Sequence, residues 1–208
     1  MPKLLLASGN KAKLQELVSL LQDLPYRLVT PSEIGISANV EEVGNSLEEN
    51  ARLKAVTFAA RSQLLTLADD SGLEVDALNG EPGVLSARYA GENASDIERI
   101  NHLLKRLKGI PQEKRQAKFR CLIAIATPDG QVRLCSGECY GFITLEPRGK
   151  QGFGYDPIFY LPQLGKTMAE LPPEIKNQVS HRGQAARKAS QLLLRIRDNK
   201  ISDNRLEY

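Results

Sequence analysis

The sequence predicts an α/β protein in which helices lie on both flanks of an elongated central mixed β-sheet. Strand-like and helix-like patterns alternate through the first half of the chain, as is typical of strand–helix units. The second half holds two long strand-like stretches, residues 119–127 and 132–145, joined by the turn signal Pro128-Asp129-Gly130. Strand–helix units beside a long hairpin predict one mixed sheet with two lobes and a cleft between them.

The first half of the chain is expected to form two strand–helix units. Apolar residues of the first helix recur with helical spacing, at Leu14, Leu17, Val18, Leu21 and Leu24. The second helix opens with a capping-box pattern, Ser46 with Glu49. In order, we expect a strand at 3–7, a break at 8–10, a helix to about residue 24, a helix from 46 to about 61 and a buried strand at 64–68.

The next strand is expected at 73–78, and it ends in the turn signals Asn79-Gly80 and Pro82-Gly83. A capping box of Ser95 with Glu98 predicts a third helix. Its apolar face is expected to comprise Ile97, Ile100, Leu104 and Leu107. After the hairpin come a glycine-rich loop, a last amphipathic helix from Gly183 to about Arg197, and a polar end from 198 that is expected to fray.

Length and composition limit the class of protein. A chain of 208 residues with 41% apolar residues is expected to form a single domain, 1–208, with a proper core. The net charge of +3 suits an anionic small ligand and is too weak to indicate a nucleic-acid partner. No stretch reaches membrane length, and the three cysteines are expected to be reduced core thiols. These features favour a cytoplasmic protein without a membrane partner.

The most informative motif is Asp69-Asp70-Ser71-Gly72, which directly follows the buried strand at 64–68. Ligands of open α/β sheets bind outside the carboxyl ends of the strands. Two adjacent carboxylates repel each other unless a positive charge lies beside them, and Mg²⁺ prefers such oxygen ligands. The motif therefore indicates a metal site, and a solvated turn is the alternative.

Lysines in two segments of the chain indicate a phosphate-binding site. Ser8-Gly9-Asn10-Lys11-Ala12-Lys13 is a strand-to-helix turn, and it places two cations in the first helical turn, where the helix dipole disfavours them. A bound polyphosphate would resolve this conflict, and two solvated lysines on a surface helix are the alternative. Lys54 shares the apolar stripe of the second helix, so its ammonium either snorkels to solvent or points into a cleft.

Three further segments carry candidate binding residues. The acidic pair Glu41-Glu42 either favours the helix that follows it or supplies a metal ligand. The loop Gly152-Phe153-Gly154-Tyr155-Asp156-Pro157 is either a stacking platform for a base or a tight turn anchored by one buried ring. Lys176 and Ser180-His181-Arg182-Gly183 offer directed hydrogen-bond donors, with Ser180 as a candidate N-cap.

Together these segments resemble the inosine triphosphate pyrophosphatase family, also called the non-canonical purine NTP pyrophosphatases. The resemblance runs from Leu5 to about Leu194. It rests on the order and spacing of the stretches 7–13, 49–55, 68–73, 82–89, 152–157 and 180–183. The family's first motif often has Thr where this chain has Ser8, which keeps the hydroxyl.

The resemblance implies a long mixed sheet with two lobes around a deep cleft, and a homodimer. It also implies Mg²⁺-dependent cleavage of ITP, dITP and XTP to the monophosphate and pyrophosphate, which would clear deaminated purines from the nucleotide pool. By position, it implies that Glu41 and Asp70 hold the metal, that Asp70 is also the base and that Ser71 contacts the substrate. The phosphates would be held by Ser8, Gly9, Asn10, Lys11, Ala12, Lys13 and Lys54. The base and sugar would be surrounded by Phe153, Gly154, Tyr155, Asp156, Lys176, His181 and Arg182.

Several alternatives stay open at the level of sequence. Glu42 can replace Glu41 as the metal ligand, and Asp69 can replace Asp70 as the base. A septum-associated nucleotide pyrophosphatase would share the architecture but prefer other bases. A non-catalytic nucleotide-binding protein would bind without turnover, and it would not need four acids near the cleft.

Overall fold

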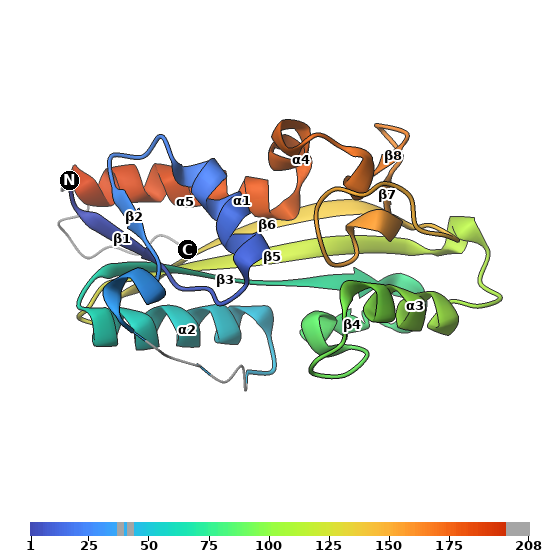
Figure 1. Cartoon of the computed structure of the whole chain (residues 1–208), viewed down its shortest axis with the longest axis horizontal. Coiled ribbons are helices and arrows are strands. Elements are labelled where there is room, and N and C mark those ends of the chain that lie inside the picture. The colour runs from blue at the N-terminus through green and yellow to red at the C-terminus, as the bar shows by residue number, and fades with distance from the viewer. Residues whose placement is uncertain (37–39, 41–43, 199–208) are drawn as a thin grey trace.

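The structure is a computed structural model of the chain, and it describes residues 1–36, 40 and 44–198. The described residues form one eight-stranded sheet with helices on both faces (Figure 1). The helices are α1 (Lys11–Leu21), α2 (Leu47–Ser62), α3 (Asp96–Arg106), α4 (Pro173–Val179) and α5 (His181–Arg197). The strands are β1 (Lys3–Leu6), β2 (Arg27–Val29), β3 (Leu65–Val75), β4 (Pro82–Gly83), β5 (Gln116–Ala126), β6 (Val132–Ile143), β7 (Phe159–Leu161) and β8 (Lys166–Thr167).

The sheet is mixed and long, as the sequence predicts. Its strand order is β2-β1-β3-β5-β6-β7-β8, with β4 paired to β3. Strand β1 runs parallel to β2 and β3, and every other pairing is antiparallel. The β5–β6 hairpin is the predicted one, and it pairs from Gln116 opposite Phe142 to Ala126 opposite Val132.

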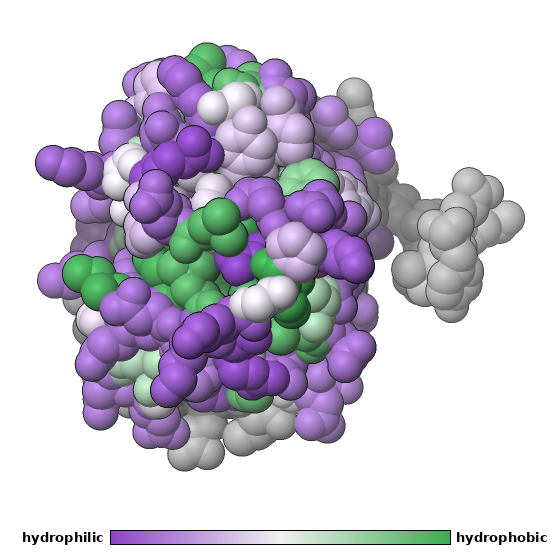
Figure 2. Space-filling model, turned by 90° about the vertical axis from the view of Figure 1, so that its right-hand side faces the viewer, coloured by the Kyte–Doolittle hydropathy of each residue, from purple (hydrophilic) through white to green (hydrophobic). Residues whose placement is uncertain are grey.

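Three apolar clusters hold the helices to the sheet. On one face, α1 and α5 pack against it through Leu17, Leu21 and Ala189. On the other face, α2 packs through Ala51, Ala55 and Phe58. The third cluster joins α3 to the far end of the sheet. Figure 2 views that end, where apolar residues gather at the centre and hydrophilic residues surround them.

One prediction about the sheet is wrong, and it concerns the acidic pair. The strand at 64–68 does not end at Asp69, because β3 continues to Val75 and includes the predicted strand at 73–78. Within β3, Asp69 lies opposite Ile123 and Asp70 opposite Leu122 of β5. The neighbour on the other side ends earlier, since Leu6 of β1 pairs with Leu67. The acids therefore lie in mid-strand, just beyond the end of β1, where one side of β3 loses its neighbour.

Other boundaries differ in smaller ways. Helix α1 ends at Leu21, and α5 begins at His181 rather than Gly183, because the Ser180 hydroxyl accepts a hydrogen bond from the Gly183 amide. Ile97 is 70% exposed, so its place on the apolar face of α3 is wrong, whereas Ile100 and Leu107 are buried as predicted and Leu104 is partly buried. Leu103, which is buried beside them, was not predicted. The capping box at Ser95 and Glu98 is complete. At Ser46 only the serine half forms, since the Glu49 carboxylate accepts from Asn45 N.

Strand β2 is an element that the sequence pattern did not indicate, because it has only three residues. The three cysteines are buried and form no disulfide, as expected. Among the described residues, no helix combines the length and the apolar character needed to cross a membrane.

Candidate active site

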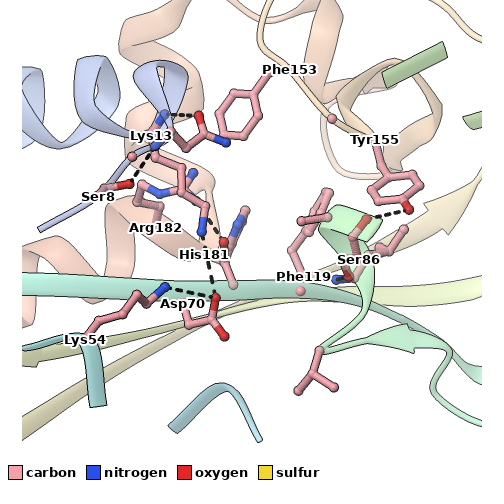
Figure 3. A pocket seen from close by; sticks show the side chains of 18 of the residues that line it. Ser8, Lys13, Lys54, Asp70, Ser86, Phe119, Phe153, Tyr155, His181 and Arg182 are labelled. Atoms are coloured by element: carbon pink, nitrogen blue, oxygen red, sulfur yellow. Dashed lines mark hydrogen bonds and ion pairs between the residues drawn. The ribbon is translucent and has the colours of Figure 1, made fainter. Parts of the chain in front are cut away.

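A cavity of about 320 Å³ lies where β1 ends beside β3 (Figure 3). It brings together segments from the whole length of the chain. Fourteen of the predicted residues line it: Ser8, Gly9, Asn10, Lys13, Lys54, Asp70, Ser71, Phe153, Gly154, Tyr155, Asp156, Lys176, His181 and Arg182. Lys11 is exposed and, like Ala12, does not line this cavity. Glu41 and Glu42 lie outside the described residues.

The turn after β1 aims Lys13 at the acidic pair. Asn10 is the N-cap of α1, and its side-chain oxygen accepts a hydrogen bond from Lys13 N at 3.1 Å. Lys13 Nζ lies 3.4 Å from Asp69 Oδ2 and 4.0 Å from Asp70 Oδ1. The carboxylates of β3 thus offset the cost of a cation in the first turn of a helix.

Lys54 of α2 reaches the same acids from the opposite face of the sheet. Its Nζ donates to the backbone oxygen of Asp69 at 2.7 Å and lies 3.4 Å from Asp70 Oδ1. The side chain is only 11% exposed. Of the two orientations that the sequence allowed, the structure has the one that points into the cavity.

The two adjacent acids have different environments, because successive side chains of a strand point to opposite faces. The side chain of Asp69 is fully buried and accepts from Arg182 Nε at 3.3 Å and Nη2 at 3.2 Å. Burial raises the pKa of Asp69, but the charges of Lys13, Arg182 and Lys54 outweigh burial and hold this pKa well below its ordinary value. Asp70 is the acid that lines the cavity.

Glu16 is a site residue that the sequence analysis missed. Its carboxylate bridges two predicted cations, with Oε2 at 2.6 Å from Arg182 Nη1 and Oε1 at 2.7 Å from Lys176 Nζ. Its position three residues after Lys13 on α1 puts both side chains on one face of the helix. That spacing was a usable signal, but the partners come from α4 and α5, which only the fold brings near.

Phe153 presents its ring to the cavity between two glycines (Figure 3). The ring centre lies 5.0 Å from Lys176 Nζ and 5.5 Å from Arg182 Cζ. Its backbone is fixed by Asp156, whose Oδ2 accepts from Phe153 N at 2.9 Å and also bonds the Lys176 ammonium. A Cβ at Gly152 would lie 2.0 Å from that same oxygen, so only glycine fits there.

Tyr155 has a different role from Phe153. It is buried, and its hydroxyl donates to the backbone oxygen of Ser86 at 2.9 Å. The buried ring that the sequence allowed as an anchor of this turn is Tyr155, whereas the ring of Phe153 faces the cavity, and base stacking on it stays a prediction.

His181 lies buried beside the cations. Its ring stacks on Phe119, with ring centres 4.6 Å apart and an 11° angle between the ring planes. Burial, together with the charges of Arg182 and Lys176, lowers the pKa of His181 well below its ordinary value. Its Nδ1 has no hydrogen-bond partner among the described residues. A neutral imidazole at the cavity wall offers one donor and one acceptor.

The sequence of this chain was compared with known protein families and proteins. The sequence model of the Ham1 family matches residues 4–192. This chain belongs to the Ham1 family. A protein named dITP/XTP pyrophosphatase from Desulforamulus reducens is 50% identical over 93% of this chain and 96% of its own length. A protein of the same name from Geobacter sulfurreducens is 51% identical over 89% of this chain and 93% of its own length.

Solved structures agree with the Ham1 assignment. A HAM1 protein from Coxiella burnetii matches with a TM-score of 0.85 and 45% identity, covering 93% of this chain and 99% of that one. The Staphylococcus aureus Ham1 protein matches with a TM-score of 0.81 and 44% identity, covering 92% and 98%. These matches confirm the predicted α/β class, a mixed sheet flanked by helices.

The donors that this Ham1 protein offers a metal are few among the described residues. No group of three or more His, Cys, Asp or Glu side chains converges in that part of the chain. The cavity does present the Asp70 carboxylate, a hard oxygen donor. Mg²⁺ is commonly bound through one or two carboxylates together with substrate phosphates. The donor set therefore fits a divalent cation that arrives with a phosphorylated ligand.

Proposed function

We propose that this Ham1 protein hydrolyses the purine nucleoside triphosphates dITP, XTP and ITP to the monophosphate and pyrophosphate. The observation that carries the proposal is one cavity joining a cationic, carboxylate-bearing end to an aromatic ring. Lys13, Lys54 and Asp70 form the charged end of the cavity, and the Phe153 ring is part of its lining. The names of the relatives, dITP/XTP pyrophosphatase, support this substrate class.

Lys13 and Lys54 would bind the triphosphate. Both ammonium groups lie within 4.0 Å of the Asp70 carboxylate, on different sides of β3. A triphosphate carries several negative charges and would take over the lysine contacts that Asp70 now makes. The N-terminus of α1, with Ser8 and Asn10 beside it, adds backbone donors and the positive end of the helix dipole.

Asp70 would hold a divalent cation such as Mg²⁺ and orient the attacking water. The cation, when bound, would neutralise charge on the phosphates and on the leaving pyrophosphate. Water would attack the α-phosphorus, and its proton would pass to the Asp70 carboxylate. The bond between the α-phosphorus and its bridging oxygen would break, and the pyrophosphate would leave with that oxygen.

The base would stack on Phe153 and be read by donors near it. Hypoxanthine and xanthine carry a keto oxygen at position six, which only accepts hydrogen bonds, whereas adenine carries an amino donor there. Arg182, Lys176 and His181 line the cavity and can donate to that oxygen. Two donors facing each other in a desolvated pocket would cost adenine about 1–3 kcal/mol.

A product assay tests this function. The purified protein is incubated with Mg²⁺ and, separately, with dITP, XTP, ITP, GTP or ATP, and released pyrophosphate and orthophosphate are measured. We expect pyrophosphate from the first three substrates and much slower release from ATP. Stepwise release of orthophosphate would refute the reaction, faster turnover of GTP or ATP would indicate another base preference, and binding without turnover would indicate a non-catalytic protein.

The phosphate contacts predict a second result. Lys13→Ala and Lys54→Ala are each expected to weaken binding of dITP more than binding of dIMP, since the cations lie at the predicted triphosphate end. Calorimetric titration of both nucleotides measures the difference. Equal losses for the two ligands would assign the lysines a purely structural role.

A further inference from the structure

The loop that carries Phe153 is attached to α3 as well as to α4. Gly154 N donates to Asp96 Oδ2 at 2.6 Å, across 58 positions of sequence. Asp96 is the first residue of α3, and its side chain is 40% exposed. It does not line the cavity itself, whereas Gly154 and Phe153 do. Asp96 can therefore affect a bound ligand only indirectly, through the Phe153 loop or through Arg99, which lines the cavity and bonds Asp96.

Arg99, one turn further along α3, holds Asp96 in place. Its Nη2 bonds the other carboxylate oxygen of Asp96, and its Nη1 donates to the backbone oxygen of Ala87 at 2.5 Å. The neighbouring Tyr155 hydroxyl bonds Ser86 of the same segment. Both oxygens of Asp96 are thus engaged, one by α3 and one by the Phe153 loop.

The ring of Phe153 depends on such attachments because its neighbours cannot fix it. Gly152 and Gly154 both have positive φ, 75° and 62°, and have no side chains to pack. The loop backbone is held on one side by Asp156, which accepts from Phe153 N, and on the other by Asp96, which accepts from Gly154 N. Loss of Asp96 would release the Gly154 amide next to the ring, while the bonds of Asp156 and of the Tyr155 hydroxyl would remain.

We infer that Asp96 is a positioning residue for nucleobase recognition: from α3, it fixes the orientation of the Phe153 ring. The inference rests on the proposed function, because it assumes that the ring stacks on the base of a nucleotide. It assigns Asp96 no contact with the phosphates and no part in the chemical step.

The test compares a nucleotide with inorganic tripolyphosphate, which has three phosphates and no base. Asp96→Ala is expected to raise KM for dITP about tenfold, as for the loss of one hydrogen bond to a charged group, with a smaller change in kcat. The inhibition constant of tripolyphosphate should stay unchanged. Asp96→Asn keeps one acceptor oxygen and should give an intermediate KM. Glu92→Ala is the control, because it removes an exposed carboxylate shortly before α3 and leaves the capping box of Ser95 and Glu98 intact.

A double-mutant cycle separates positioning from general structural damage. In a Phe153→Ala background, Asp96→Ala should have no further effect on KM, because the ring through which it acts is gone. An equal effect in both backgrounds, or a parallel loss of tripolyphosphate inhibition, would overturn the inference.

Amide hydrogen exchange at Gly154 tests the contact without any turnover. Exchange should accelerate in Asp96→Ala and not in Glu92→Ala, and unchanged exchange in Asp96→Ala would overturn the inference. If the wild-type protein failed to hydrolyse dITP, the proposed function would fail first, and that result is distinct from either outcome here.

Discussion

Asp69 and Asp70 are adjacent in β3, but their side chains have different environments and are expected to have different roles. Asp69 points to the face of α1 and α5, where Arg182 and Lys13 surround it and no solvent reaches its side chain. Asp70 lines the cavity, where the proposed triphosphate would bind. A buried carboxylate already bonded by a guanidinium is a poor base, so the geometry favours Asp70 for the reaction.

The two acids are therefore predicted to respond differently to the same substitution. Asp70→Asn should lower kcat by about 10²–10⁴-fold through loss of the base, with the fold retained. Asp69→Asn should destabilise the protein, by less than the about 3–5 kcal/mol of a fully broken buried pair, because the buried Arg182 loses one carboxylate partner and keeps Glu16. Steady-state kinetics and urea unfolding measure the two effects. The assignment is contradicted if Asp69→Asn is stable but inactive while Asp70→Asn keeps its activity.

His181 predicts a pH dependence of stability. Its pKa is lowered in the folded protein, so between that value and the unfolded value of about 6.5 the unfolded chain binds the extra proton. The free energy of unfolding therefore keeps its full value above pH 6.5. Below pH 6.5 it decreases as the pH falls, by up to about 1.4 kcal/mol per pH unit. His181→Gln should flatten this slope between pH 6.5 and 5 in urea unfolding. Identical slopes in both proteins would show that His181 titrates alike in the folded and unfolded states.

At the scale of elements, the site depends on how closely α5 approaches β6. A Cβ added at Gly137 would lie 2.1 Å from the His181 carbonyl oxygen and 2.7 Å from Ala185 N. Both are backbone atoms of the first turns of α5, which cannot move aside cheaply. The absence of a side chain at Gly137 therefore allows α5 to place His181 and Arg182 at the cavity.

Gly137→Ala is accordingly predicted to push the start of α5 away from the sheet. The expected cost in stability is about 1–3 kcal/mol, as for other overpacked sites, and kcat/KM for dITP should fall with it. Thermal unfolding and kinetics measure both. Ser136→Ala is the control, because Ser136 is the neighbouring, exposed residue of β6 and should change neither value. A fully active and stable Gly137→Ala protein would show that α5 tolerates the extra methyl group.

At the scale of the whole molecule, the site lies where the sheet changes from parallel to antiparallel pairing. Strand β1 is parallel to β3 and stops at Leu6, whereas β5 continues beside β3 to Val75. The end of β1 leaves room for the turn into α1 and for the cavity. The long β3–β5–β6 ladder connects this region to α3, whose Asp96 reaches back to the Phe153 loop.

The homodimer implied by the sequence resemblance is a prediction about the whole molecule in solution. Light scattering after size-exclusion chromatography should give a mass of twice the 23.0 kDa of the chain. A mass of one chain, independent of protein concentration, would contradict it.

The sequence by itself determined the α/β class with its mixed sheet, the hairpin, the starts of α1, α2 and α3, and most of the cavity-lining residues. These depend on local physics: apolar spacing, capping at Ser95 and Ser180, and turn signals such as Pro128-Asp129-Gly130. The resemblance to a nucleotide pyrophosphatase family added the expected substrates and the expected roles of individual residues. These signals can be recognised in a sequence because each involves only residues that are close together in the chain.

Only the tertiary structure decided that β3 runs through the acidic pair, because strand length depends on the partner strand. Hydrogen bonding to β5 carries β3 past Asp69, although an acidic pair usually reads as a break. The same holds for Lys54, whose direction is set by the acids it meets, and for Glu16, whose partners lie 160 and 166 positions away. Long-range charge pairing selects among side-chain orientations that the local sequence leaves equal in energy, so these choices are made only when the chain is folded.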